Sequence, residues 1–256
     1  MTTLVFGHKS PDTDSTGSPI IWAWYLTETG TPAKPVLLGE PNTEAAFVLR
    51  HWGLDKPAII SDVTADDKVV IVDTNNPAEL PPSINEAQIQ AIIDHQLLVG
   101  GIKTKTPIDI TIRPLACTAT IMHDLMGDAL AQAPREIKGA MLSCILSDTL
   151  EFRSPTTTPH DRAVAEKLAA DLGVSIPDFA AEMFAAKSDV SAFSDAALLR
   201  MDSKEYNVAG KELRVSVLET TAPQVLLDRK ASLMASMVDV AKEDGADQVL
   251  LFVIDI

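Results

Sequence analysis

The residues best suited to chemistry lie in the segment 7–15, Gly-His-Lys-Ser-Pro-Asp-Thr-Asp-Ser, directly after the apolar run 4–6. This segment carries one histidine and two aspartates, His8, Asp12 and Asp14. Imidazole and carboxylate groups are both good ligands for divalent cations, and a loop between a strand and a helix can bring them together. The segment is therefore predicted to supply half of a metal site.

Three later apolar runs also end in an acidic residue. They are 69–72 with Asp73, 91–93 with Asp94 and His95, and 141–146 with Asp148. A single aspartate after a strand is more often a turn former or a helix cap than a ligand. Four strand ends of one parallel sheet, however, point toward the same crevice, so independent caps explain the whole set poorly. The coincidence favours a shared site for two metal ions.

The elements that must position these residues alternate along the first three quarters of the chain. The patterns predict strands at 4–6, 36–38, 58–60, 69–72, 91–93 and 141–146, and helices at 20–27, 43–52 and 160–172. Proline after serine or threonine marks the start of the first and third helices. This alternation predicts an α/β fold, a parallel sheet with helices on both faces, and functional residues at the carboxyl ends of the strands.

A change of composition divides the chain near residue 188. The Ser- and Asp-rich segment 188–194 is predicted to link a metal-binding catalytic domain, residues 1–187, to a smaller α/β domain, residues 195–256. In the second domain the patterns predict two hairpin strands, a long helix and a final strand, at 205–208, 213–218, 222–244 and 248–256. Because the chain ends within an apolar strand, we expect this domain to be incomplete.

Composition narrows the possible functions. With 46% apolar and 22% charged residues and a net charge of −15, the chain is typical of globular proteins and unsuited to binding nucleic acid over a broad face. The negative charge also means that an anionic substrate needs metals or a basic cluster to attract it. Neither a membrane span nor a secretory signal is visible, which favours the cytoplasm.

The remaining histidines, cysteines and tryptophans are expected to be structural. Cys117 and Cys144 stand in apolar surroundings and are predicted to be free buried thiols. Three histidines fall on helical patterns without an acidic partner motif, and three tryptophans fit helix faces packed on the sheet: His51, His123, His160, Trp22, Trp24 and Trp52.

The ordered set of motifs resembles the manganese-dependent (family II) inorganic pyrophosphatases of the DHH phosphoesterase superfamily. The resemblance rests on segments 7–15, 73–75, 94–96, 117–120, 147–150, 152–156, 202–204 and 252–256, and covers essentially the whole chain. It implies a hydrolase that cleaves inorganic pyrophosphate to two phosphates and forms a homodimer through its N-terminal domain. An uncovered edge strand would give that pairing a physical motive.

The resemblance also implies a role for each site residue. One Mn²⁺ or Co²⁺ would be held by His8, Asp12 and Asp73, and the other by Asp14, Asp73, His95 and Asp148. Asp73 would bridge the two ions, and Asp94 would support the ligands from behind. Asn75, Gln96 and Lys204 would contact the substrate.

Such a site would solve the charge problem, because four ligating aspartates balance two divalent cations. Two ions ~3.5–4 Å apart can share one water and lower its pKa, which gives a bridging hydroxide as nucleophile. Either Asp12 or Asp73 could accept the proton. Additional Mg²⁺ arriving with pyrophosphate would offset its remaining charge.

Three departures from the family pattern affect the expected activity. Gln96 stands where the name-giving Asp-His-His motif has its last histidine. Glutamine can donate a hydrogen bond but cannot deliver a proton near neutral pH. As a catalytic residue Gln96 therefore predicts a slower enzyme that still binds its substrate. Thr74 replaces a histidine of many members, with a modest expected effect. No Ser-Arg-Lys-Lys segment occurs within residues 1–256, and each lost charge-assisted phosphate contact is worth about 1.5–3 kcal/mol.

Two other functions remain open at this stage. One is a different DHH phosphoesterase, a polyphosphatase or a phosphodiesterase for short oligonucleotides, although the basic or aromatic track that nucleic acid prefers is not visible. The other is a low-activity, metal-dependent binder of phosphate or nucleotide, which Gln96 and the missing basic segment make credible. Phosphate release from pyrophosphate, tripolyphosphate and a dinucleotide would separate the three.

Overall fold

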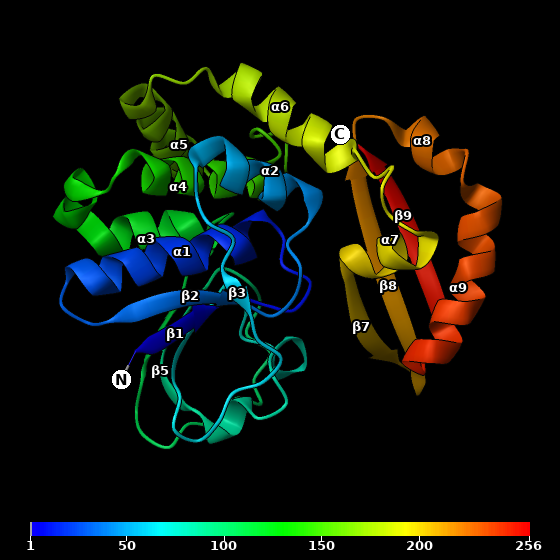
Figure 1. Ribbon diagram of the computed structural model, residues 1–256, viewed down its shortest axis with the longest axis horizontal. Helices are drawn as coiled ribbons and strands as arrows, with labels where there is room; N and C mark the ends of the chain where they lie inside the picture. Colours follow the sequence, from blue (N-terminus) through cyan, green and yellow to red (C-terminus); the bar gives the residue numbers. More distant parts are fainter. Residues whose placement is uncertain (1) are drawn as a thin grey trace. The chain divides into compact units, whose positions relative to one another are not determined.

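The computed structural model describes residues 2–256 and divides them into two compact units (Figure 1). The first unit contains the residues up to Pro41 together with Ala45–Ala180, and the second contains Asn42–Glu44 together with Ala181–Ile256. Within residues 2–256, none of the helices combines the length and the apolar character needed to cross a membrane.

The first unit is built on a six-stranded parallel sheet. Its elements are β1 (Thr3–Phe6), α1 (Thr13–Glu28), β2 (Ala33–Leu37), α2 (Thr43–Trp52), β3 (Ala58–Ile59), β4 (Lys68–Val72), η1 (Pro77–Glu79), η2 (Ile84–Glu86), β5 (Gln88–Asp94), β6 (Asp109–Ile112), α3 (Thr118–Met126), η3 (Gly127–Gln132), α4 (Arg135–Thr149) and α5 (Pro159–Leu172), followed by α6 (Ile176–Ser188), which continues into the second unit.

The strand order β3-β2-β1-β4-β5-β6 creates a switch point at its centre. From β1 the chain moves outward to β2 and β3, and from β4 it moves the opposite way to β5 and β6. In open parallel sheets the crevice at such a point, beside the carboxyl ends of the two central strands, is where ligands bind. The predicted parallel sheet is confirmed, and strand β6 adds a member that the sequence patterns did not indicate.

Right-handed crossovers explain how the two faces of the sheet are covered. Connections that run in opposite directions from the centre lie on opposite faces. Helices α1 and α3 pack on one face, and α4 packs on these two helices (Figure 1). On the other face, alternate strand residues such as Phe6 and Ile71 pack against Leu80 and Ile84 from the β4–β5 connection. The long helices thus gather on one face, and short 3₁₀ turns and loops cover the other.

The predicted strand at 141–146 is wrong, because these residues lie within helix α4. This helix contacts α1, α3 and α5, and the side chains from Ala140 to Leu146 are buried without interruption. A helix buried on all sides produces a continuous apolar run, which periodicity cannot distinguish from a buried strand. Asp148 therefore reaches the site from the last turn of a helix and not from the end of a strand.

Helix α1 begins seven residues before the predicted start at 20. Asp12 is its N-cap and accepts a hydrogen bond from Ser15 N at 2.8 Å. Pro19, which marked the predicted start, lies inside the helix. The earlier start brings Asp14 into the first helical turn.

The second unit contains a three-stranded mixed sheet. After α6 its elements are α7 (Asp195–Met201), β7 (Ser203–Val208), β8 (Lys211–Thr220), α8 (Pro223–Leu227), α9 (Lys230–Asp244) and β9 (Gln248–Asp255). Strand β8 pairs with β7 in the predicted antiparallel hairpin and with β9 in parallel. The predicted single helix 222–244 is wrong, since it breaks at Asp228 and Arg229, where Arg229 binds Asp195 Oδ1 at 2.6 Å and Phe193 O at 2.8 Å.

Candidate metal centre

The loop after β1 is shaped by a close approach between Gly7 and helix α1. Ser15 Oγ accepts a hydrogen bond from His8 N at 2.7 Å. A Cβ atom on Gly7 would lie 2.0 Å from the same oxygen, so only glycine fits here. The His8 ring then turns Nδ1 toward the backbone oxygen of Lys9, 2.6 Å away. Because a carbonyl only accepts, Nδ1 carries the hydrogen and Nε2 faces the candidate site.

Asp14 is held from two sides at the bottom of the site. Ser18 Oγ donates a hydrogen bond to its Oδ1. Thr118 N, at the start of α3, donates to Oδ2 at 2.8 Å, and Cys117 Sγ lies 3.2 Å from the same oxygen. The N-terminus of a helix favours a negative charge, so this carboxylate is fixed in place although it is fully buried.

Asp73 occupies a strained position at the end of β4. Its backbone is left-handed, with φ of 57°, a conformation that is unfavourable for any residue with a Cβ and that concentrates at functional sites. One carboxylate oxygen, Oδ2, lies 3.5 Å from His8 Nε2, and the other, Oδ1, lies 3.4 Å from His95 Nε2. Thr118 Oγ1 donates to Oδ1 at 3.2 Å. The two oxygens of one carboxylate thus face two different histidines.

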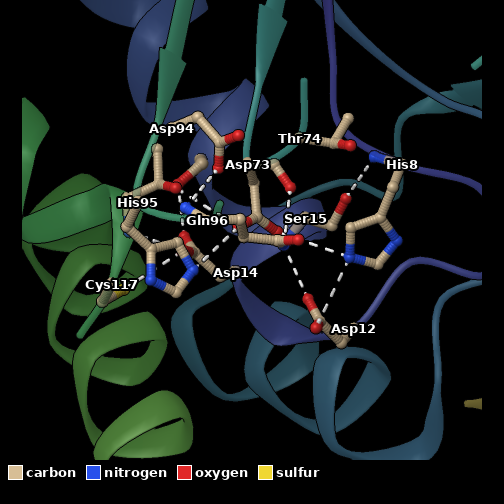
Figure 2. Close-up of polar contacts among 12 residues, drawn as sticks. His8, Asp12, Asp14, Ser15, Asp73, Thr74, Asp94, His95, Gln96 and Cys117 are labelled. Atoms are coloured by element: carbon tan, nitrogen blue, oxygen red, sulfur yellow. Dashed lines mark hydrogen bonds and ion pairs between the residues drawn. The ribbon is translucent and has the colours of Figure 1, made fainter. Parts of the chain in front are cut away.

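The six predicted ligands form two groups. Figure 2 labels all of them except Asp148. Within each group one ligand atom of every residue lies within 4.8 Å of the others; the groups are His8, Asp12 and Asp73, and Asp14, His95 and Asp148. In Figure 2 Asp73 lies between the histidines of the two groups. These six residues come from different helices, strands and loops, and the fold brings them together in the two groups.

Charge repulsion and burial dominate the electrostatics of the site. Burial and the nearby Asp14 raise the pKa of Asp73 to about 7. Burial and the same neighbour raise the pKa of Asp148 well above its ordinary value. Burial alone would lower the pKa of His8, but Asp12 and Asp73 raise it to about 10. For His95 burial likewise lowers the pKa, but Asp73, together with Asp14 and Asp94, raises it to about 9.

The donor set fits divalent cations. Among the described residues, Asp73 Oδ2 and Asp148 Oδ2 are buried oxygen atoms that accept no hydrogen bond. A buried carboxylate without partners is costly unless it is neutralised or coordinates a cation. Mixed imidazole and carboxylate ligands suit manganese and related metals. The residues present therefore fit one cation in each group, with Asp73 in reach of both.

The residues predicted to surround the ligands have well-defined partners. Asp94 does not contact the ring of its neighbour: the Nδ1 atom of His95 faces Leu115 O at 3.2 Å. Instead, Asp94 accepts hydrogen bonds from Asn75 Nδ2 at 2.5 Å and from Gln96 N at 3.0 Å. Its role is thus to fix the loop that carries His95.

Two predicted substrate contacts in the first unit differ in how they are held. Asn75 uses both ends of its amide internally, on Asp94 Oδ2 and Leu97 O through Nδ2 and on Val99 N through Oδ1. Gln96 is half-buried and donates through Nε2 to Asp73 O at 3.1 Å. The third predicted contact, Lys204, lies on β7 of the second unit.

Several partners of the ligands were not anticipated from the sequence. The contacts of Cys117 and Thr118 with Asp14 join residues about a hundred positions apart, for which no local pattern gives a signal. His123 and His160 both lie beside Asp124, at 3.3 Å and 2.8 Å, a partner that their helical sequence patterns did not indicate. The prediction of free buried thiols is confirmed for Cys117 and Cys144.

Comparison with known families and proteins gives a consistent result. The model of the DHH family, N-terminal domain, matches residues 2–148, and the model of the DHHA2 domain matches residues 181–256. A probable manganese-dependent inorganic pyrophosphatase of Deinococcus radiodurans is 41% identical over 98% of this chain and 82% of its own length. A protein of the same description from Bacillus licheniformis is 33% identical over 99% of this chain and 82% of its own length.

Solved structures show the same similarity. A Methanococcus jannaschii protein, described as a candidate family II inorganic pyrophosphatase, superposes with a TM-score of 0.89 at 31% identity, covering 100% of this chain and 84% of the other. An exopolyphosphatase-related protein from Bacteroides fragilis superposes with a TM-score of 0.58 at 14% identity, covering 85% of this chain and 65% of the other. The second likeness reflects the fold alone.

Proposed function

The chain belongs to the manganese-dependent inorganic pyrophosphatases of the DHH family, and on that premise we propose that it hydrolyses inorganic pyrophosphate to two phosphates with two bound Mn²⁺ ions. One observation carries the proposal: six ligands gather in two groups, and the carboxylate of Asp73 faces both histidines. Co²⁺ fits the same donor set, and Mg²⁺ would accompany the substrate.

In this proposal His8, Asp12 and Asp73 hold one ion, and Asp14, His95 and Asp148 hold the other, with Asp73 shared. Such a pair of cations would supply Lewis acidity and would lower the pKa of a water molecule, which would become the hydroxide nucleophile. The protein orients the ligands: Nδ1 of each histidine donates a hydrogen bond to a backbone oxygen, so Nε2 faces the site. Ligands oriented in this way bind metals more tightly.

Asp12 is the better candidate to accept the proton of the attacking water. Its side chain is 37% exposed, whereas that of Asp73 is 2% exposed. A group that passes a proton onward to solvent must be accessible to it, and Asp73 is enclosed and committed to both groups. We therefore propose that Asp12 accepts the proton of the attacking water and that Asp73 is the ligand shared by both ions.

Gln96 takes the place from which the family's second histidine would act on the substrate. Its amide can donate a hydrogen bond to a phosphate oxygen but has no proton to deliver near neutral pH. Loss of general acid catalysis typically lowers a rate ~10²–10⁴-fold. We propose that the enzyme binds pyrophosphate through Gln96 and turns it over slowly, and that Asn75 serves as a positioning residue. For Lys204 of the second unit the role in substrate binding stays a prediction.

We also propose that the protein works as a homodimer through its first unit. Strand β6 is the last strand of the six-stranded sheet, and its Ile110 is 57% exposed. An edge strand with exposed apolar side chains offers unpaired backbone groups to a second copy. Sedimentation of the purified protein would test this, with a monomer at micromolar concentration as the contrary result.

A substrate panel tests the proposed function. The protein is stripped of metal, supplied with Mn²⁺, and offered pyrophosphate, tripolyphosphate and a dinucleotide while phosphate release is measured. Pyrophosphate is expected to be the preferred substrate. Preference for one of the other two would indicate a different DHH phosphoesterase, and binding of pyrophosphate by calorimetry without any turnover would indicate a binder.

A further inference from the structure

The short segment 115–118, which leads into helix α3, contacts ligands of the second group directly. Leu115 O lies 3.2 Å from His95 Nδ1 and fixes the orientation of that ring. Three residues later, Thr118 N donates to Asp14 Oδ2 at 2.8 Å. Two of the three ligands in the group of Asp14, His95 and Asp148 are therefore oriented by this one segment.

The same segment reaches the shared ligand as well. Thr118 Oγ1 donates to Asp73 Oδ1 at 3.2 Å, and Cys117 Sγ lies 3.2 Å from Asp14 Oδ2. In this contact the sulfur donates and the carboxylate oxygen accepts. Figure 2 shows Cys117 beside Asp14 and His95.

The segment is in turn held by Asp161, a fully buried carboxylate in the first turn of α5. The capping box of α5 consists of two hydrogen bonds: Thr158 Oγ1 accepts from Asp161 N at 3.2 Å, and Asp161 Oδ2 accepts from Thr158 N at 3.0 Å. Asp161 Oδ2 accepts a second hydrogen bond from Thr158 Oγ1 at 2.5 Å. The same oxygen also accepts from Ala116 N at 3.1 Å, across 45 residues of sequence. This third hydrogen bond plays no part in capping α5.

We propose that Asp161 is a positioning residue of the metal centre. By holding Ala116 N it fixes the residues on either side, Leu115 and Cys117, at the distances at which they orient His95 and Asp14. The inference rests on the metal centre of the proposed function but goes beyond it, because Asp161 is neither a ligand nor a contact of one.

The contacts predict an unequal effect on the two metal ions. The segment 115–118 orients Asp14 and His95 of the second group, whereas in the first group it touches only Asp73. Loss of the hydrogen bond to Ala116 should therefore weaken the second site more than the first. A general loss of stability would weaken both sites together.

The test is Mn²⁺ binding to the metal-free full chain, measured by competition with a chromophoric chelator, which does not depend on enzymatic activity. Loss of an outer partner of a metal ligand typically costs ~10–100-fold in affinity. For Asp161→Ala we expect a loss of about 10-fold at one class of site and less than about 3-fold at the other. The variants His8→Ala and Asp148→Asn identify which class is which.

Two matched variants separate positioning from capping. Thr158→Ala removes the hydroxyl from the capping box but leaves the bond between Asp161 and Ala116, so both affinities should stay within about 3-fold of the wild type. Asp161→Asn keeps an acceptor oxygen and should restore most of the lost affinity. Asp161→Ser, whose side chain is too short to span the distance to Ala116, repeats the test if the alanine variant does not fold.

Equal loss at both classes, no loss at either, or the same loss in Thr158→Ala would overturn the inference and leave Asp161 as a helix cap. These outcomes are distinct from failure of the proposed function, which is judged by phosphate release from pyrophosphate by the wild-type chain and not by the Mn²⁺ affinities of the variants. The visible spectrum of the Co²⁺-loaded variants gives a second readout: a change in the bands of the second site alone is expected.

Discussion

Gln96 donates a hydrogen bond through Nε2 to the backbone oxygen of Asp73, over 3.1 Å. The contact fastens the residue after His95 to the one left-handed residue among the six ligands, Asp73, whose φ is 57°. Because that conformation is unfavourable for aspartate, such a bond helps to maintain it. Gln96 therefore supports the backbone of Asp73, in addition to the contact with the substrate that we propose for it.

Replacing Gln96 with histidine should raise turnover. An imidazole can deliver a proton to the leaving phosphate, which typically contributes ~10²–10⁴-fold, so we expect Gln96→His to increase kcat at least ~10-fold. The measurement is phosphate release from pyrophosphate at saturating Mn²⁺. Gln96→Ala, which removes the hydrogen bond to Asp73 without adding an acid, is the control and should be slower than the wild type. An unchanged or lower kcat in Gln96→His contradicts the assignment.

Binding of Mn²⁺ should release protons. In the metal-free chain Asp12 and Asp73 outweigh burial and raise the pKa of His8 to about 10, and Asp73 likewise raises that of His95 to about 9. Both histidines are protonated at neutral pH and must lose a proton to bind a metal. The affinity for Mn²⁺ should therefore increase from pH 6 to pH 9. Calorimetry in two buffers of different protonation enthalpy measures the release, and identical heats in both would contradict it.

The metal-free protein should become less stable as the pH rises. A histidine whose pKa is raised by folding stabilises the folded state fully below its unfolded value of 6.5, and the contribution is lost as the pH passes about 9 for His95 and about 10 for His8. Burial raises the pKa of Asp73 to about 7, which acts in the same direction because the charged form is disfavoured in the folded state. Urea unfolding should show a lower midpoint at pH 9.5 than at pH 6.5.

A control for this pH effect is the protein saturated with Mn²⁺, in which the histidines are deprotonated at both pH values. Its midpoint should be higher than that of the metal-free protein and should not fall in the same way. A metal-free midpoint that rises with pH would mean that the two histidines are not protonated in the folded state.

Substitution of Gly7 should damage both stability and the first group of ligands. A Cβ atom there would lie 2.0 Å from Ser15 Oγ, and relieving such a clash typically costs ~1–3 kcal/mol. Gly7→Ala should lower the free energy of unfolding by about that amount. Gly39→Ala, where the new atom would meet Pro11 Cδ at an ordinary 3.4 Å, is the matched control and should behave as the wild type.

The double variant Gly7→Ala with Ser15→Ala tests the cause. It removes the oxygen that a Cβ on Gly7 would strike, so part of the lost stability should return, although His8 N then loses its acceptor. If the double variant is less stable than the wild type by the sum of the two single-variant effects, the clash with Ser15 Oγ does not contribute to the loss of stability.

Much of the site could be predicted because it follows local rules. Asp73 and His95 each stand directly after a buried strand, and His8 is separated from its strand only by Gly7. The rule that parallel strands end at one crevice was enough to group them. Asp148 lies with Asp14 and His95, as the sequence predicted. The predicted strand before it is wrong, because that apolar run is a buried helix, which resembles a buried strand in sequence.

The partners of the ligands could not be predicted, because their contacts join distant parts of the chain. Thr118 and Asp14 are 104 residues apart, and no periodicity or cap signal connects them. Asp161 gives a local signal, but the signal indicates only the capping box with Thr158; the bond to Ala116 depends on how α5 packs in the folded unit. Such residues are visible only in three dimensions.

The central claim, that two Mn²⁺ ions share Asp73 and together support hydrolysis of pyrophosphate, is tested most directly by titrating the metal-free protein with Mn²⁺ while following both binding and phosphate release. We predict two ions bound per chain, activity that appears only as the second is bound, and for Asp73→Asn a loss of activity together with weaker binding of both ions. Full activity with one ion per chain, or an Asp73→Asn variant with unchanged affinity and turnover, would contradict the claim.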